Sequence, residues 1–321
     1  MNAADLERKE IIEKHINDRT SIDEEISQKE LIEVSEIIKQ LNSFIDGNLE
    51  LSTNGIEIRI ERLIRRFTIN LIYELDSEIA FRRARKFEEK TSKIPHCFDT
   101  LQDLSYILDK KKHIIPLGRF NKKEESIFYA SLHYKDDEEQ LFHTALSEID
   151  AHKLEYINVL DSIPTKRLKV AYVGVFDYFI RNVKIPKWID EHYAITFKLF
   201  RKKCVEKKNL AIFQSFILTN AFLADVVKRD GSERLYRVTS TISSYLLKEP
   251  NTDAIVYESV KVKNSPVIAI RTDIVDDCLE HKEAYCWQIE ENLGYGIYST
   301  NIINECEIDA FTLDWNEGVV Y

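Results

Sequence analysis

Two apolar stripes in the first quarter of the chain recur every three or four residues, the spacing of one face of a helix. They run over residues 31–45 and 60–75, and Gly47 follows the first as a stop signal. Ser21 and Glu24 have the spacing of a capping box, which predicts a helix start there. We therefore expect residues 1–75 to form two or three amphipathic helices.

Shorter apolar runs follow, and many of them have the length and residue types of strands. We expect strands at 126–131, 169–176, 254–257 and 267–270, with another within 150–163. Helices are expected near 98–109, 137–150, 189–203, 210–227 and 239–248, and a β-rich tail over 295–321. No regular βαβ alternation, GxGxxG loop or GxxxxGK[ST] loop is present, which argues against a Rossmann dehydrogenase and a P-loop NTPase. The pattern predicts an α+β protein.

Composition narrows the class further. The 321 residues include 45 Lys and Arg against 55 Asp and Glu, a net charge of −10 that argues against general nucleic-acid binding or a polybasic membrane contact. The longest apolar stretch, 209–227, is interrupted by polar residues, so we expect a buried helix and no membrane partner. The N-terminus is charged, and the 5 cysteines form no CxxC pair. These features predict a cytoplasmic protein with reduced thiols and no metal site.

Four short segments could carry chemistry. They are 81–85 (FRRAR); 118–121 (GRFN) with 127–131 (IFYAS); 144–149 (TALSEI); and 236–240 (YRVTS) running into 253–260 (DAIVYESV). In this order the segments resemble the RES domain family, which is named for its Arg, Glu and Ser positions. The family pattern is an aromatic with RxR, then RxN, an aliphatic-Tyr-Ala strand, TALxE, and D-G-I-x-Y-x-S. The resemblance covers about residues 79–275.

The resemblance implies a fold similar to ADP-ribosyltransferases and action on NAD+. RES proteins hydrolyse or phosphorolyse the nicotinamide–ribose bond, so NAD+ is a substrate and no separate cofactor is implied; phosphate is a possible co-substrate. Several are toxins of toxin–antitoxin pairs, restrained by a helix-turn-helix antitoxin, and members often self-associate, so we expect a homodimer. The implied organisation is a helical N-terminal domain at 1–75, a RES domain at 76–275, and a β-rich extension at 276–321 packed on the RES domain.

Three side chains match the catalytic positions of the family: Glu148, Arg83 and Tyr129. Cleavage of the glycosidic bond builds positive charge on the ribose, which a carboxylate such as Glu148 would stabilise. Arginine suits the pyrophosphate because its planar fork binds phosphate oxygens in pairs, which makes Arg83 a candidate. Tyr129 offers an aromatic face to the nicotinamide ring.

The remaining matches imply further contacts with NAD+. Arg119 is the second phosphate-binding candidate, and Arg85 is the next choice after Arg83. Ser259 offers a hydroxyl to a ribose or phosphate oxygen, and Tyr257, two residues earlier, would share its side of a strand. Asn121 is expected to hold its own loop through bonds from its side chain to the backbone.

Three departures from the family concern loops. A polar run, 122–125 (KKEE), replaces a Gly-containing turn; Ala254 replaces the usual Gly; and an acidic insert occupies 134–140. Two alternatives therefore stand beside NAD+ breakdown. One is an ADP-ribosyltransferase that modifies a protein target, since both reactions use the same donor site. The other is a non-catalytic NAD-binding or interaction protein.

Overall fold

The protein is α+β, as the sequence predicts. The computed structural model describes residues 3–69, 72–75, 78–88, 92–134, 138–181, 184–248, 252–308 and 313–317. The chain divides into two compact units, one of Met1–Leu71 with Val173–Tyr245 and one of Ile72–Tyr172 with Leu246–Tyr321. We refer to them as the helical unit and the sheet unit.

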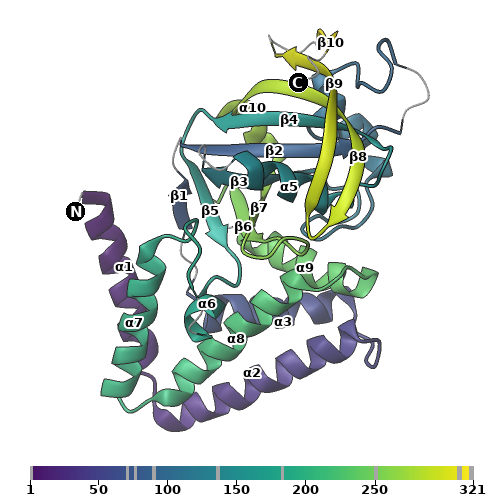
Figure 1. Ribbon diagram of the computed structural model, residues 1–321. Helices are drawn as coiled ribbons and strands as arrows, with labels where there is room; N and C mark the ends of the chain where they lie inside the picture. The colour runs from purple at the N-terminus through teal and green to yellow at the C-terminus, as the bar shows by residue number, and fades with distance from the viewer. Residues whose placement is uncertain are drawn as a thin grey trace. The chain divides into compact units, whose positions relative to one another are not determined.

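The helical unit is arranged around one apolar helix, α8 (Figure 1). Its helices are α1 (Ala3–Thr20), α2 (Glu24–Ile45), α3 (Thr53–Phe67), α6 (Phe176–Ile180), α7 (Glu191–Glu206), α8 (Leu210–Lys228) and α9 (Glu233–Leu246). Helices α2, α3, α6 and α7 all contact α8, and α2 makes the most extensive of these contacts. Buried residues from α2, such as Val34 and Leu41, and from α8, such as Phe216 and Leu223, supply the core.

Helix α8 is also long and apolar enough to cross a membrane, with a mean hydropathy of 1.7. Of its apolar window, 67% is buried inside the protein. The prediction of a buried helix at 210–227 is therefore confirmed. Its composition follows from burial, because a helix that is apolar all round needs neighbours on several sides.

The boundaries of the first helices differ in detail from the sequence prediction. Helix α2 begins at Glu24, and its N-cap is Asp23 in place of Ser21. The Asp23 carboxylate accepts the backbone N–H of Glu25, and the Ser21–Glu24 capping box does not form. Helix α3 ends at Phe67, so the second apolar stripe does not continue as a helix to residue 75. Residues Ile72–Leu75 form a strand instead. Within it, buried and more exposed side chains alternate, which is the pattern of a half-buried strand.

The sheet unit contains one mixed sheet with the order β1-β5-β6-β7-β3-β2-β4-β8-β9-β10. The strands are β1 (Ile72–Leu75), β2 (Ile79–Lys86), β3 (Ile127–Tyr134), β4 (Tyr156–Pro164), β5 (Leu168–Tyr172), β6 (Ala254–Glu258), β7 (Pro266–Arg271), β8 (Leu279–Gly294), β9 (Ile297–Glu307) and β10 (Asn316–Glu317). Strands β5 and β6 pair in parallel, and the other described pairs are antiparallel. Short helices α4 (Leu101–Leu104), η1 (Asp109–Ile114, 3-10), α5 (Glu138–Glu148) and α10 (Thr272–Cys278) belong to the same unit.

The predicted strands at 126–131, 254–257 and 267–270 are present as β3, β6 and β7, and the strand within 150–163 is β4. The predicted helix at 98–109 is wrong: only α4, four residues long, forms there, and η1 follows it. Strand β2 was not predicted, and β8 was expected only as part of the β-rich extension at 276–321, without bounds of its own. Both strands contain charged residues at many positions, so neither has the apolar or alternating pattern by which a strand is recognised. They are buried mainly by neighbouring strands.

The division of the chain differs from the expected one. Residues 173–245 lie in the helical unit with the N-terminal helices, although the motif order places them inside a RES domain. The reason is the apolar surface of α8, which α2 and α3 cover. Strands β8 and β9 continue the sheet edge to edge from β4, so residues 279–307 extend the sheet by hydrogen bonding.

The register of the central strands assigns each side chain to one face of the sheet. Phe81 pairs with Leu132, and Arg82 pairs with Ser131. Because successive side chains alternate, Arg82 and Ala84 share one face. That face carries a core with α5, built from Ala84, Ala145, Leu146, Ala151, Ile157, Val159, Trp287 and Ile289. We call it the α5 face, and the opposite one, which carries Phe81 and Leu132, the α4 face.

Candidate functional site

Tyr129 and Tyr257 both belong to the α5 face, although they lie on different strands far apart in sequence. Tyr129 of β3 is two residues from Ser131 and so shares its face. Ser131 is opposite Val267 of β7, and Val267 is opposite Tyr257 of β6. The chain of cross-strand neighbours therefore puts both tyrosines on one side of the sheet.

Glu148 and Ser259 are joined directly by a hydrogen bond across 111 positions of sequence. Glu148 ends α5, and Ser259 follows β6 and is buried. The Ser259 Oγ accepts the backbone N–H of Lys261 at 3.1 Å and of Val262 at 2.9 Å. Since these bonds use the oxygen's acceptor sites, its single O–H is directed at the Glu148 carboxylate. In the described part of the chain, Glu148 has no ion-pair partner.

The GRFN loop is fastened to the same face through its Asn and Phe. The Asn121 Nδ2 donates to the carbonyls of Pro116 and Lys122, at 2.8 and 2.9 Å, as the sequence predicts for this side chain. The Tyr129 hydroxyl donates to Asn121 Oδ1 at 3.0 Å and accepts the backbone N–H of Phe120 at 2.9 Å. The Phe120 ring meets Tyr257 edge-on, with centroids 4.5 Å apart.

Gly118 is required for this loop to close. A Cβ at position 118 would lie 2.3 Å from Asn121 Oδ1, well inside contact distance. The same loop turns back at Glu124, which has a φ of 65°, a left-handed conformation that favours glycine. The polar run at 122–125 thus turns through a left-handed backbone conformation at a residue that is not glycine.

Arg119 is close enough to Tyr129 to influence its titration. Burial raises the pKa of the Tyr129 phenol above its usual range, and the positive charge of Arg119 opposes that rise. Tyr129 therefore stays a neutral donor near neutral pH. Its hydroxyl is committed to the loop, while the residue keeps some surface accessible.

Arg83 and Arg85 belong to the α4 face, opposite the residues above. Arg83 donates from Nε to the Leu104 carbonyl at 3.1 Å and from Nη1 to the Tyr129 carbonyl at 2.9 Å. Its guanidinium also lies 5.3 Å from the centroid of the Phe128 ring. Burial, with Arg85 nearby, lowers the pKa of Arg83 to about 9. Arg83 thus touches the backbone of Tyr129, and the sheet separates it from the Tyr129 ring.

Arg82, and not the expected Arg83 or Arg85, is the arginine of the FRRAR segment that belongs to the α5 face. It forms a two-pronged ion pair with Asp161, its cross-strand neighbour, and lies 5.5 Å from the Trp287 ring. The motif does not single out Arg82, because the RxR pattern matches Arg83 and Arg85. A strand assignment for 79–86 would have revealed the alternation.

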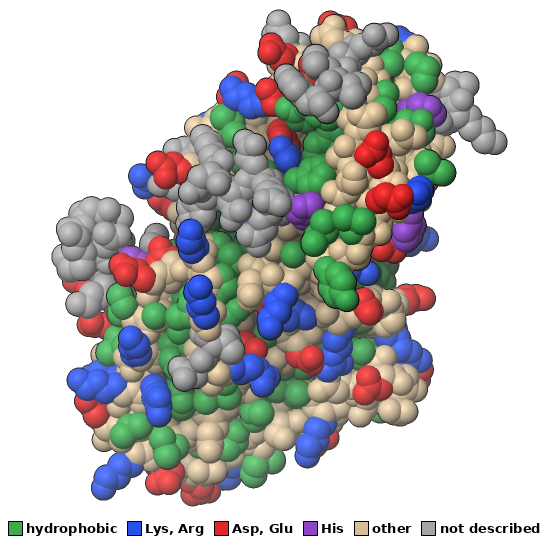
Figure 2. Space-filling view, in the orientation of Figure 1, with side chains coloured by type: hydrophobic (Ala, Val, Ile, Leu, Met, Phe, Trp, Pro, Cys, Tyr) green, Lys and Arg blue, Asp and Glu red, His purple; other side chains and the backbone are tan. Residues whose placement is uncertain are grey.

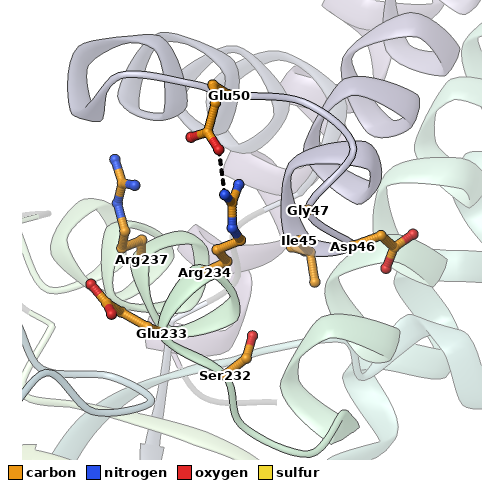
Figure 3. A pocket seen from close by; sticks show the side chains of 8 residues that line it. All are labelled: Ile45, Asp46, Gly47, Glu50, Ser232, Glu233, Arg234 and Arg237. Atoms are coloured by element: carbon orange, nitrogen blue, oxygen red, sulfur yellow. Dashed lines mark hydrogen bonds and ion pairs between the residues drawn. The ribbon is translucent and has the colours of Figure 1, made fainter.

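The YRVTS segment lies in α9, within the helical unit. There, a cavity of about 450 Å³ is lined by residues that include Arg234, Arg237, Glu50 and Ser232 (Figure 3). Arg234 donates to the carbonyls of Phe44 and Leu49 and pairs with Glu50, and Arg237 donates to the Leu51 carbonyl. These bonds fix the end of α2 and the segment that follows it, so we assign the two arginines a structural role.

Charged side chains on the visible surface are mixed. On the face shown in Figure 2, Lys and Arg side chains are interspersed with acidic and apolar ones. Over the residues that the structure describes, no group of three or more His, Cys, Asp and Glu is placed to hold a metal ion. The five cysteines are free thiols, four of them buried.

No protein-family model matches the chain, and neither a curated protein nor a solved structure matches it. The functional assignment below therefore depends on the motif residues and on where the fold puts them.

Proposed function

We propose that the sheet unit is a RES-type enzyme that cleaves NAD+ at the nicotinamide–ribose bond. The observation that supports this most strongly is the hydrogen bond from Ser259 to Glu148. These residues come from two separate motifs, and local structure gives no reason for them to meet. Tyr257, from the same segment as Ser259, and Tyr129, from a further segment that also carries Arg119, belong to the same face.

In this mechanism Glu148 acts on the ribose. As the C1′–N bond breaks, nicotinamide leaves with the bonding electron pair and positive charge develops at C1′. The Glu148 carboxylate, held in place by Ser259, stabilises that charge. An oxygen of water or phosphate then bonds to C1′, and an attacking water releases its proton to solvent or to Glu148.

Arg119 is the phosphate-binding residue of this proposal, because it belongs to the loop that contacts Tyr129 on the α5 face and lies close enough to Tyr129 to affect its pKa. Tyr129, held by Asn121, supplies aromatic surface beside it, and the buried Phe120 ring packs on Tyr257. Arg83 and Arg85 contribute from the other face, by supporting β3 through the Tyr129 carbonyl and by packing on α4. Of the expected phosphate contacts, our proposal thus keeps Arg119 and leaves out Arg83 and Arg85.

The test is NAD+ consumption by the purified chain, with and without phosphate, beside Glu148→Gln. The variant keeps the size of the side chain and removes its charge, and we expect at least a hundredfold loss of rate. Glu290→Gln is a matched control, since Glu290 also accepts a serine hydroxyl, that of Ser299, on an exposed hairpin. It should retain the rate of the unmodified chain.

The outcomes separate the candidate reactions. Loss of NAD+ that depends on phosphate identifies phosphorolysis, and loss without phosphate identifies hydrolysis. Radiolabel from the adenylate half appearing on a protein band identifies transfer of ADP-ribose instead. Saturable NAD+ binding with no turnover by the unmodified chain contradicts the enzymatic proposal. Growth arrest on expression, relieved by Glu148→Gln, would connect the activity to a toxin.

A further inference from the structure

The hairpin that joins β8 to β9 closes beside the Glu148–Ser259 hydrogen bond. A Cβ at Gly296, in its turn, would lie 3.3 Å from the Ser147 Oγ and 3.4 Å from the Val262 Cγ2. Ser147 precedes Glu148 at the end of α5. The Val262 N–H donates to the Ser259 Oγ at 2.9 Å. The end of the hairpin (294–296) and the loop between β6 and β7 (259–265) therefore lie side by side next to this bond, and we call them the rim (Figure 1).

An aromatic side chain stands at the hairpin end of the rim. Tyr295 is fully exposed, and its φ of 57° is a left-handed conformation that is strained for a bulky residue. The turn is nevertheless fixed, because the Asn292 side chain accepts the Gly294 N–H at 2.9 Å and donates to the Ala151 carbonyl at 3.0 Å. A strained backbone that is held in place and presents a large ring to solvent is typical of a ligand contact.

The β6–β7 loop supplies positive charge to the rim. Lys261 and Lys263 are exposed, and among the residues that the structure describes neither forms an ion pair. The loop has a defined shape, because the Lys261 N–H donates to the Ser259 Oγ at 3.1 Å and the Ser259 N–H donates to the Ser265 carbonyl at 2.8 Å. Glu258, the carboxylate that precedes Ser259, is buried and accepts a backbone N–H of the same loop at 2.9 Å.

The substrate of the proposed reaction needs positive charge at this place. In NAD+ the pyrophosphate is joined to the nicotinamide ribose through a single CH₂ group, so it lies close to Glu148 when that carboxylate acts on the ribose. Arg119 is the cation that the mechanism above assigns to the two phosphates. A lysine ammonium is a mobile point charge that also binds phosphate, and Lys261 lies two residues after the serine that holds Glu148. The adenosine then extends beyond the pyrophosphate, away from Glu148.

We propose that the rim binds the adenosine diphosphate half of NAD+, an inference that rests on the function proposed above. Lys261 and Lys263 contact the pyrophosphate, and the Tyr295 ring stacks on the adenine. The rim thus holds the part of the substrate that does not react, while Glu148 acts on the ribose. All three residues lie outside the motif positions that the sequence indicates.

Isothermal titration of the full chain with ADP and with inorganic pyrophosphate tests this assignment without turnover. A double variant, Lys261→Gln with Lys263→Gln, should weaken both ligands about fivefold or more, because both carry the pyrophosphate. Tyr295→Ala should weaken ADP about fivefold or more and leave inorganic pyrophosphate unchanged, because only ADP carries a base. Tyr295→Phe keeps the ring and should bind ADP like the unmodified chain.

Kinetics with NAD+ give a second readout. The double lysine variant and Tyr295→Ala should raise KM about fivefold or more and leave kcat unchanged, because neither change touches the bond that breaks. Lys282→Gln is the matched control, since Lys282 is an exposed lysine of the same unit that pairs with Glu280 of β8. It should match the unmodified chain in both measurements.

The outcomes separate this inference from the proposed function. Absence of saturable ADP binding at millimolar concentration overturns the inference, as does ADP binding that the rim variants leave unchanged. Equal weakening of ADP and pyrophosphate by Tyr295→Ala would overturn the stacking assignment. NAD+ turnover with an unchanged KM in the variants overturns the inference and leaves the proposed function standing. ADP binding that depends on Lys261 and Tyr295, in a chain that does not consume NAD+, supports the rim and contradicts the proposed function.

Discussion

At the scale of single residues, His281 shows how burial controls chemistry in the sheet unit. Its Nδ1 lies 2.7 Å from the Ser162 hydroxyl and its Nε2 lies 3.5 Å from the Ser105 hydroxyl. Burial lowers the pKa of His281 to about 4, an effect that Asp276 opposes and Arg83 reinforces. The imidazole is therefore neutral at physiological pH, which suits a ring held between two hydroxyls.

This shift predicts a pH-dependent loss of stability. In the unfolded chain His281 takes up its proton near pH 6.5, whereas in the folded chain it does so near pH 4. Its contribution is present above about pH 6.5 and is lost as the pH falls toward 4, by up to about 3 kcal/mol. The free energy of unfolding in urea, measured at pH 7 and at pH 4.5, should differ less between the two pH values for His281→Gln than for the unmodified chain. The exposed variant His152→Gln should show the same difference as the unmodified chain. The same difference between pH 7 and pH 4.5 in all three proteins would contradict the prediction.

At the scale of elements, the loop before β3 decides where the aromatic residues of the site stand. Asn121 is buried and pinned by Pro116, Lys122 and Tyr129. Its position depends on the absence of a side chain at Gly118. The position of Tyr129 on the strand therefore depends, through Asn121, on Gly118, a residue that has no side chain to take part in the reaction.

Gly118→Ala should disturb the site more than its size suggests. The new methyl group forces the Asn121 amide away, and buried hydrogen bonds are lost at about 1–3 kcal/mol. We expect lower stability in urea and, in the proposed reaction, a higher KM for NAD+, because Arg119 and Tyr129 shift with the loop. Lys123→Ala, an exposed change in the same loop, serves as the control. A Gly118→Ala protein with unchanged stability and KM would show that the loop tolerates displacement of Asn121.

At the scale of the whole molecule, the helical unit is assembled from two distant parts of the sequence. The Asn209 side chain, just before α8, donates to the Ile22 carbonyl and to the Ser27 hydroxyl. Arg229, just after α8, donates to Asn42 at 3.0 Å. Both ends of α8 are thus tied to the N-terminal helices. The N-terminal segment therefore belongs to the core of the helical unit and is more than an appendage.

Deletion of residues 1–69 should consequently make the chain aggregate. It uncovers the faces of α8 that α2 and α3 bury, including Phe216 and Leu223, and an exposed apolar surface of that extent promotes association. Size-exclusion chromatography of the truncated chain measures this directly. Co-expression of 1–69 as a separate chain should restore the soluble species. A truncated chain that elutes as a compact, folded species would contradict the prediction.

The sequence by itself determined the elements whose pattern is local. The apolar stripe of α2, the long and mainly apolar stretch of α8 and the β-branched runs of β6 and β7 follow from periodicity and residue type. The motif residues could also be found from the sequence, because a short motif is recognised by its residue types and spacing alone. Asn121 is an example, because an amide in a turn has few other partners than nearby backbone.

Tertiary structure decided the remaining questions, because they depend on pairing between distant segments. A shift of one residue in the register moves a side chain to the other face of a sheet, so only the alignment of β2 with β3 separates Arg83 from Tyr129. The meeting of Glu148 with Ser259 depends on where α5 ends relative to β6. The inclusion of 173–245 in the helical unit follows from burial of α8, a long-range effect that no local pattern encodes.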